Sequence, residues 1–411
     1  MYLKFILIVI SCILIVDFYY YRALKQFVIK LKPTLKNTIK VSYWLFTLAT
    51  LIFMFYVVSF FVNKEPAPKF ARVYIFGVIL IILVSKLIGS LFIIIHDIKG
   101  LFNYLKRKLA QNELPSKTRR QFLKNTAIIA SALPFGTLMF GVVKSAFDFT
   151  IRKQQLNIPN LPNSFKGLKI VQISDIHLGS FMSDEPIKEA VKMILAQNAD
   201  IIFFTGDLVN EITEEALPFI DALKEIKAPL GVYSILGNHD YGDYFYQKDD
   251  IDGKKHNYKL MQAVHQQLGW KLLLNEHHII EKDNERLAVL GVENWGKLER
   301  FPKLGDIKKA KQGTKKEDVK LLLSHDPSHW EAHVIPNHKD IAATFSGHTH
   351  GMQFGIEIPG FKWSPSKYLY KYWAGHYTKG TQQIYVNRGL GFLGYPGRVG
   401  ILPEITVFTL R

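Results

Sequence analysis

The 411-residue chain contains one cysteine, Cys12, which lies in an apolar run near the N-terminus. A single cysteine excludes an intrachain disulfide, so cysteine usage says nothing about the redox compartment. The chain also contains no internal repeat and no low-complexity linker. Its length is sufficient for two or more domains, which other features must locate.

Acidic residues are scarce in the first 150 residues, which hold 20 Lys and Arg against 5 Asp and Glu. Residues 151–411 hold 32 basic residues against 30 acidic ones, so the net charge of +17 belongs almost entirely to the N-terminal third. A strongly basic chain would ordinarily indicate a nucleic-acid partner. Because the C-terminal part is nearly neutral, that interpretation loses its electrostatic support, and we expect no nucleic-acid partner.

Long apolar runs dominate the N-terminal third. A helix needs about 20 apolar residues to cross a bilayer. The sequence therefore predicts a membrane region over residues 1–150 with about four transmembrane helices, at residues 3–21, 43–62, 73–95 and, more weakly, 125–143. Lys86 lies within the third span. With no acidic partner evident in the spans, we expect it to pack inward or to reach toward the interface rather than to mark an ion pathway.

The loops between these spans are basic. Residues 22–40 hold six basic residues and no acid, and residues 99–124 are similarly basic. Basic loops stay on the cytoplasmic side of a membrane. With four spans, we expect a multi-pass protein of the cytoplasmic (inner) membrane, with the N-terminus and the whole C-terminal domain on the extracytoplasmic side.

A short motif precedes the fourth span. Residues 116–124 read Ser-Lys-Thr-Arg-Arg-Gln-Phe-Leu-Lys, and the pair Arg119 and Arg120 resembles a twin-arginine export signal. The alternative is that two arginines merely flank a helix, because the pair is internal rather than near residue 1. The first interpretation would make the twin-arginine export machinery a partner, and both leave the C-terminal domain outside.

Residues 151–411 alternate strand-like and helical patterns. Strand-like runs at 169–174, 201–205 and 231–236 are separated by helical spacing at 186–197 and 214–227. This order implies right-handed crossovers and a sheet with helices on its faces. Further strands are predicted at 270–274, 286–292, 319–324, 342–345, 383–386 and 405–410. We therefore expect an α/β domain in which a second sheet packs on the first.

Metal-ligand side chains follow these strands where each one ends, the edge at which open α/β sheets place ligands. They are Asp175, His177, Asp207, Asn238, His325, His348 and His350. Oxygen and imidazole ligands without a thiolate suit Mn, Fe or Zn better than Ca or a structural zinc. Asp207 has two oxygens and can bridge two cations, and cations about 3.5 to 4 Å apart can hold a bridging hydroxide that attacks a phosphoryl group. The pattern indicates a two-metal hydrolase.

The motifs around these residues resemble, in order, the signature of calcineurin-like metallophosphoesterases. They read Asp-Ile-His, Gly-Asp, Gly-Asn-His-Asp, Ser-His-Asp and Gly-His-Thr-His, within a resemblance that covers residues 165–411. The resemblance implies two packed mixed β-sheets flanked by helices. It implies a first divalent metal bound by Asp175, His177, Asp207 and His350, and a second bound by Asp207, Asn238, His325 and His348. It also implies that His239 is the acid near the leaving group and that Asp240 orients it.

Together with the membrane region and the arginine pair, the C-terminal stretch from Gly389-Leu-Gly391 to Pro403-Glu404 resembles the exported bacterial branch of that family. Arg388 and Arg398, in a Gly-rich stretch, are predicted either to contact a substrate phosphate or to be structural. The aromatic stretch 361–377 either grips a lipid-like or aromatic substrate or packs as an ordinary loop.

We therefore expect a membrane-anchored phosphoesterase that hydrolyses a phosphodiester or pyrophosphate by attack of a metal-bridging hydroxide. Anchoring favours a lipid-linked or envelope phosphate as substrate. One alternative is a sugar-nucleotide pyrophosphate hydrolase of the UDP-2,3-diacylglucosamine type in lipid A synthesis, although an outward topology counts against it because nucleotide-linked precursors are cytoplasmic. An alternative of another class is a non-catalytic, metal-binding membrane sensor or scaffold.

Overall fold

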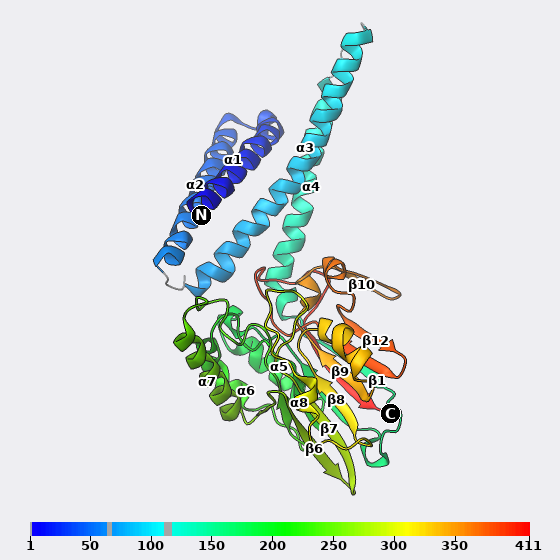
Figure 1. Cartoon of the computed structure of the whole chain (residues 1–411). Coiled ribbons are helices and arrows are strands. Elements are labelled where there is room, and N and C mark those ends of the chain that lie inside the picture. The colour runs from blue at the N-terminus through cyan, green and yellow to red at the C-terminus, as the bar shows by residue number, and fades with distance from the viewer. Residues whose placement is uncertain (1, 64–67, 111–116) are drawn as a thin grey trace. The chain divides into compact units, whose positions relative to one another are not determined.

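The computed structural model describes residues 2–63, 68–110 and 117–411. The chain divides into two units, Met1–Phe140 and Gly141–Arg411. Figure 1 shows the first as long helices, in blue to cyan, and the second as strands and shorter helices, in green to red. The side chains of Arg119 and Arg120 lie outside the described part, so the export motif stays a prediction.

In the described part of the first unit, four long helices follow one another. They are α1 (Tyr2–Phe27), α2 (Pro33–Asn63), α3 (Phe76–Ala110) and α4 (Lys117–Val143), and a π-helical turn at Ala71–Ile75 leads into α3. Among the described residues, Pro33–Val57, Val73–Phe102 and Ile129–Phe147 are long and apolar enough to cross a membrane. The side chains at the start of the predicted span 3–21 lie outside the described part, so the four-span topology stays a prediction.

Lys86, inside α3, is paired with an acidic residue of α1. Its ammonium donates to Asp17 at 2.6 Å, and the two residues are 8% and 1% exposed. Tyr43 and Thr47 of α2 also donate to Asp17. The expectation that Lys86 packs inward is confirmed, but the expectation that the spans hold no acidic partner was wrong. The partners are 69 residues apart in the sequence, so helical periodicity could not pair them.

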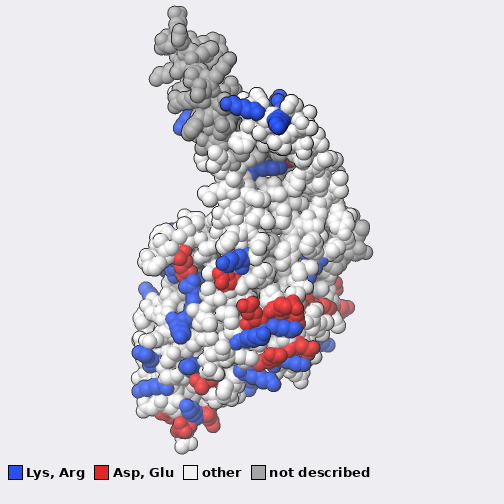
Figure 2. Space-filling view, turned by 180° about the vertical axis from the view of Figure 1, so that it is seen from behind, with Lys and Arg blue, Asp and Glu red and all other residues white. Residues whose placement is uncertain are grey.

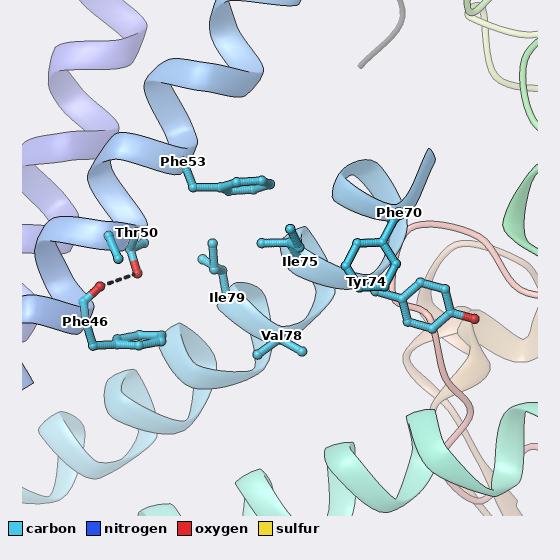
Figure 3. Close-up of a pocket in the computed structure, with 9 residues that line it drawn as sticks. Phe46, Thr50, Phe53, Phe70, Tyr74, Ile75, Val78 and Ile79 are labelled. Carbon is cyan, nitrogen blue, oxygen red and sulfur yellow. Dashed lines mark hydrogen bonds between the residues drawn. The ribbon is translucent and has the colours of Figure 1, made fainter. Parts of the chain in front are cut away.

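A cavity of about 280 Å³ lies between α2 and the start of α3. Figure 3 shows Phe46 and Phe53 of α2 opposite Ile75 and Ile79. The Thr50 hydroxyl donates back to the Phe46 carbonyl at 3.0 Å, so this polar wall residue is satisfied within its own helix. The cavity therefore offers mainly apolar contact.

Within the described residues, the second unit contains two six-stranded sheets. The first runs in the order β1 (Thr150–Leu156), β14 (Glu404–Leu410), β2 (Lys169–Ile173), β3 (Ile201–Phe204), β4 (Val232–Ser234) and β5 (Lys271–Leu272). The second runs in the order β12 (Gly375–Lys379), β13 (Gln382–Val386), β9 (Ile341–Ser346), β8 (Val319–Leu323), β7 (Glu285–Gly291) and β6 (Glu276–Lys282). Strands β2 to β5 are parallel to one another, and so are β7, β8, β9 and β13.

Successive side chains of a strand point to opposite faces of its sheet, so every second residue of each sheet faces the other sheet. The main core lies between these two inner faces. Phe203 of β3 and Phe345 of β9 meet there with ring centroids 5.0 Å apart. Leu321 of β8 faces the same core, whereas its neighbour Leu322 faces a second core that contains Trp330. The predicted α/β fold, with two packed sheets, is confirmed.

Helices cover the outer faces of the sheets. The predicted helix at 186–197 is present as α5 (Glu185–Leu195), and short helices occur at α8 (Ile307–Ala310) and α9 (Ile335–Asn337). The single helix predicted at 214–227 was wrong. Pro218 has no N–H to donate, and the segment is a 3₁₀ helix at Thr213–Phe219 followed by the one-turn α6 (Ile220–Leu223).

Several elements were not predicted. The 18-residue helix α7 (Ile251–Leu268) is mostly polar, so its sequence lacks a clear apolar stripe. Its ends nevertheless carry local signals, since the Asp250 side chain accepts from the Gly253 N–H and Gly269 adopts φ 73°. The strands β1, β6 and β12 and the hairpin β10 (Ile356–Ile358) to β11 (Phe361–Trp363) were also missed.

Candidate metal centre

The side chains predicted from the motifs follow strand ends in both sheets. Asp175, Asp207 and Asn238 come two to four residues after β2, β3 and β4 of the first sheet. His325 and His348 follow β8 and β9 of the second sheet in the same way. Because the strands within each group are parallel, their carboxyl ends lie at one edge of each sheet. Side chains from two sheets therefore meet at one place.

One cluster consists of Asp175, His177 and His350. Their potential ligand atoms all lie within 4.8 Å of one another. Nε2 of His177 is 3.0 Å from Nε2 of His350, which is 3.3 Å from Oδ1 of Asp175. All three residues are buried. Three donor atoms thus converge on one point.

A second cluster consists of Asp207, His325 and His348, again within 4.8 Å. Oδ2 of Asp207 lies 3.2 Å from Nε2 of His325 and 3.6 Å from Nε2 of His177, which belongs to the first cluster. Nδ1 of His348 lies 3.3 Å from Nε2 of His325. The Asp207 carboxylate is therefore shared between the two clusters.

Asn238 has a buried carbonyl oxygen, Oδ1, for which the described structure provides no hydrogen-bond partner. Its amide nitrogen donates to the Tyr244 hydroxyl at 2.8 Å, which fixes the amide so that Oδ1 remains free. The next residue, His239, donates its backbone N–H to Oδ1 of Asp207, so Asn238 lies in the turn beside that carboxylate. A buried oxygen that accepts no hydrogen bond is energetically unfavourable, and a bound cation would satisfy it.

Backbone carbonyls set the tautomers of two histidines. Nδ1 of His177 lies 3.2 Å from the Val209 carbonyl, and Nδ1 of His325 lies 2.7 Å from the Thr205 carbonyl. A carbonyl only accepts, so Nδ1 carries the hydrogen in both rings. Nε2, the nitrogen at the clusters, then presents its lone pair when the ring is neutral. This is the arrangement that metal-binding histidines commonly have.

Five of these residues adopt a left-handed backbone conformation. The φ angles are 50° at Asp175, 51° at His177, 58° at Asp207, 72° at His348 and 48° at His350. A residue other than glycine in such a conformation costs of order 1–3 kcal/mol, and such residues concentrate at functional sites. The surrounding sheets therefore hold these turns in a conformation that local sequence preference disfavours.

The two buried carboxylates are held in their charged form. Burial would raise the pKa of Asp175, but His350 and His325 together outweigh burial and the pKa falls to about 2. Burial would also raise the pKa of Asp207, but His325, His239 and His177 together outweigh it and hold the pKa well below its usual value. Burial lowers the pKa of His325, but Asp207 more than reverses this and raises it to about 10. Both carboxylates are thus negatively charged at neutral pH, and the His325 imidazole carries a positive charge beside Asp207.

His239 lies beside the first cluster. Its ring centroid is 4.9 Å from that of His177, and it stacks on Tyr244 at 4.2 Å. Nδ1 of His239 lies 2.6 Å from the Asn210 carbonyl. That carbonyl, rather than Asp240, is the group that orients the ring.

The expectation that Asp240 orients His239 is therefore corrected. The Asp240 carboxylate instead accepts hydrogen bonds from the backbone N–H groups of Asp207, Leu208, Val209 and Gly237. Burial and the nearby Asp207 raise the pKa of Asp240 to about 7, although the Gly237 amide opposes the shift. Asp240 ties the turn after β3 to the turn after β4.

Of the two roles predicted for Arg388 and Arg398, the described contacts support the structural one. Arg388 is 2% exposed and binds the carboxylates of Glu404 and Glu357 at 2.5 and 2.7 Å. Arg398 is fully buried and donates to several backbone carbonyls, and one of its nitrogens lies 3.3 Å from Nδ1 of His350. Neither guanidinium is exposed to a ligand, because buried charges need partners within the fold.

Two residues at the site, Asp326 and Tyr244, were not predicted to belong to it, and Tyr370 was predicted only as part of the aromatic stretch 361–377. The Tyr370 hydroxyl lies 2.7 Å from Nε2 of His348, and Asp326 lies 3.4 Å from the same nitrogen. Asp326 could have been found, because it is the last residue of the Ser-His-Asp motif. Tyr244 lies in a segment without strand or motif signals, so only the fold brings it to the site, whereas Tyr370 belongs to the aromatic stretch 361–377, for which contact with a substrate was one of the two predicted roles.

Two family models match the chain. One, described as "Probable Calcineurin-like phosphoesterase, transmembrane domain", matches residues 3–146. The other, described as "Calcineurin-like phosphoesterase", matches residues 168–352. The second match includes all seven side chains predicted to bind metal.

Curated relatives include bacterial and animal proteins. The uncharacterized metallophosphoesterase YkuE of Bacillus subtilis is 31% identical over 303 residues, covering 72% of this chain and 98% of the relative. A transmembrane protein with metallophosphoesterase domain from Danio rerio is 26% identical over 319 residues, covering 76% and 69%. The UDP-2,3-diacylglucosamine pyrophosphatase LpxG of Chlamydia trachomatis is 29% identical over 282 residues, covering 56% and 81%. The chain therefore belongs to the calcineurin-like metallophosphoesterase family and carries an N-terminal transmembrane domain.

Proposed function

We propose that the chain is a membrane-anchored phosphoesterase that hydrolyses a phosphodiester or pyrophosphate bond with a pair of divalent metal ions. The observation that carries the proposal is the Asp207 carboxylate, which lies between two clusters of oxygen and imidazole donors. One ion would be held by Asp175, His177, Asp207 and His350, and the other by Asp207, Asn238, His325 and His348.

The donor set fits such ions. Two ionised carboxylates, imidazole nitrogens and the free Oδ1 of Asn238 suit Mn, Fe or Zn, and the single cysteine of the chain is in α1 rather than at the site. When bound, two such ions supply Lewis-acid activation of water and of the phosphoryl oxygens.

The chain itself would handle the proton of the leaving group. Because Nδ1 of His239 faces the Asn210 carbonyl, Nε2 is the ring nitrogen available to donate a proton to the leaving oxygen. Tyr244 covers one face of the ring and restricts its rotation. We therefore assign His239 as the general acid.

The test uses the full-length protein in detergent, loaded with Mn, Fe or Zn, and bis-p-nitrophenyl phosphate as substrate. We expect metal-dependent turnover that falls by roughly 10²–10⁴-fold in His239→Ala, the range of general-acid contributions, and that survives in His256→Ala, an exposed control. Asp207→Asn should also lower the amount of metal bound per protein molecule, whereas Asp221→Asn should leave that amount unchanged. Absence of turnover with all three metals would instead favour a sensor or scaffold.

A second candidate substrate is a sugar-nucleotide pyrophosphate of the UDP-2,3-diacylglucosamine type. The similarity to LpxG, whose name gives that activity, favours it. The alternative is a lipid-linked or envelope phosphate, which membrane anchoring favours. Comparing UDP-2,3-diacylglucosamine with extracted membrane phospholipids as substrates of the purified protein separates the two.

We further propose that the second unit lies on the extracytoplasmic side of the inner membrane and that Arg119 and Arg120 form a twin-arginine export signal. The basic loops of the N-terminal third support this orientation. A C-terminal reporter that is active only outside the cytoplasm should be active, and Arg119→Lys with Arg120→Lys should abolish that activity. Activity of a cytoplasmic reporter alone would reverse the orientation.

A further inference from the structure

Arg300 differs from most other arginines of the second unit in its surroundings. Arg152, Arg286 and Arg388 are paired with carboxylates, and Arg398 donates to backbone carbonyls. Arg300 is exposed, and among the described residues no hydrogen bond or ion pair engages it. Its guanidinium carbon lies 4.7 Å from the centroid of the Phe301 ring, which supports it from one side. The edge of the Arg300 guanidinium and its face away from Phe301 are therefore available to a ligand.

Phe301 connects Arg300 to the candidate metal centre. The Phe301 ring is buried and meets the His348 ring edge to face, with centroids 4.8 Å apart. On another side of His348, the Tyr370 hydroxyl lies 2.7 Å from Nε2. Arg300 is thus one aromatic ring away from a residue of the second cluster, on the rim rather than inside it.

We propose that Arg300 binds the second phosphoryl group of a pyrophosphate-type substrate while the two clusters bind the phosphoryl group that is attacked. This inference rests on the proposed function. A guanidinium matches phosphate oxygens with two parallel N–H donors, which a single ammonium cannot do. The Phe301 ring separates Arg300 from the metal ligand His348. Arg300 is therefore better placed to contact the neighbouring phosphoryl group than the phosphoryl group that reacts.

The adjacent surface is consistent with an anionic substrate. A small pocket of about 50 Å³ beside Tyr370 is lined in part by Lys297 and Lys371. Lys371 is 3.4 Å from Glu331, so its charge is partly compensated, whereas Arg300 has no such carboxylate among the described residues. The charge of Arg300 is therefore less compensated than that of Lys371.

The test compares Arg300→Ala with Lys303→Ala, which removes a positive charge from an exposed site on the same loop. Binding of methylenediphosphonate, which is not hydrolysed, and of inorganic phosphate is measured by calorimetry on the Mn-loaded full-length protein in detergent. A charge-assisted hydrogen-bonded contact contributes about 1.5–3 kcal/mol, so Arg300→Ala should weaken diphosphonate binding by roughly tenfold or more. Phosphate binding and bound metal should change little, and Lys303→Ala should change neither. Arg300→Lys should recover part of the affinity.

Equal diphosphonate affinity in the wild type and Arg300→Ala would overturn the inference, as would an equal loss for both ligands. These outcomes are separate from the fate of the proposed function. A protein without turnover can still show the difference in binding, and an active enzyme can lack it.

Discussion

At the scale of single residues, the candidate site depends on groups that orient the predicted metal ligands. The carbonyls of Val209 and Thr205 select the tautomers of His177 and His325. Tyr244 selects the orientation of the Asn238 amide. Such partners commonly change metal affinity by 10- to 100-fold, so they are testable independently of turnover.

Tyr244→Phe should weaken metal binding at the second position by roughly tenfold. The substitution removes the hydroxyl that accepts from the Asn238 amide, so the amide can rotate and present nitrogen instead of Oδ1. The phenyl ring keeps its stacking on His239. Metal titration followed by calorimetry measures the effect, with Tyr246→Phe as the control. Unchanged affinity at both metal positions would show that Tyr244 does not hold the amide.

Asp240→Asn should destabilise the second unit by about 3 kcal/mol. The Asp240 carboxylate accepts hydrogen bonds from four backbone N–H groups. Asparagine would replace one carboxylate oxygen by an NH₂ group, which cannot accept from these N–H groups. Chemical unfolding of the purified protein measures the loss. Asp221→Asn, at an exposed position, should change stability by less than about 0.5 kcal/mol. Similar stability of the two variants would contradict this structural role.

At the scale of elements, strand ends and helix contacts determine what the side chains can do. The strands β2, β3, β8 and β9 were predicted within two residues of their bounds because each is a short apolar run between polar segments. The helix α7 was missed because it has few apolar residues, and the helix near Pro218 was overextended. Burial against the sheets, rather than intrinsic preference, decides these segments.

The helices α1 and α3 are joined by the pair Asp17 and Lys86. Removing one partner from a buried pair leaves an uncompensated charge and typically costs 3–5 kcal/mol. Asp17→Asn or Lys86→Met should therefore lower the thermal stability of the full-length protein in detergent. The double variant should recover much of the loss, because both charges are then absent.

Arg22→Gln provides the control, since Arg22 pairs with Asp97 at 3.4 Å where both side chains are more exposed. It should cost about 1 kcal/mol or less. A double variant as unstable as the sum of the two single variants would mean that Asp17 and Lys86 act independently.

At the scale of the whole molecule, charge and apolar residues are divided between the two units. Figure 2 shows acidic and basic side chains intermixed over the face of the second unit, whereas most of the described surface of the helical unit on this face is uncharged. The second unit also has its own cores between and outside the sheets. Such a unit meets the requirements for folding alone.

The fragment Gly141–Arg411 should therefore be soluble and unfold cooperatively. Gly141 is retained because its carbonyl accepts from the Arg398 N–H and its backbone closely approaches Tyr395. Circular dichroism during thermal unfolding, with and without Mn, measures cooperativity and the stabilisation expected from metal binding. A matched fragment that begins at Thr150 should be less stable, because it lacks that contact. Aggregation of both fragments would show that the second unit requires the first.

The sequence by itself determined the local features of this protein: the apolar spans, most strands of both sheets, the seven donor side chains and the family. Each depends on residue type and periodicity within a few positions, where backbone geometry dictates which side chains share a face. The tertiary structure decided which distant groups become partners. It engaged Arg388 and Arg398 within the fold, paired Asp17 with Lys86, bound Asp240 to the backbone, and brought Tyr244 and Tyr370 to the site. Such pairings follow from how sheets and helices pack in three dimensions, and no local pattern encodes them.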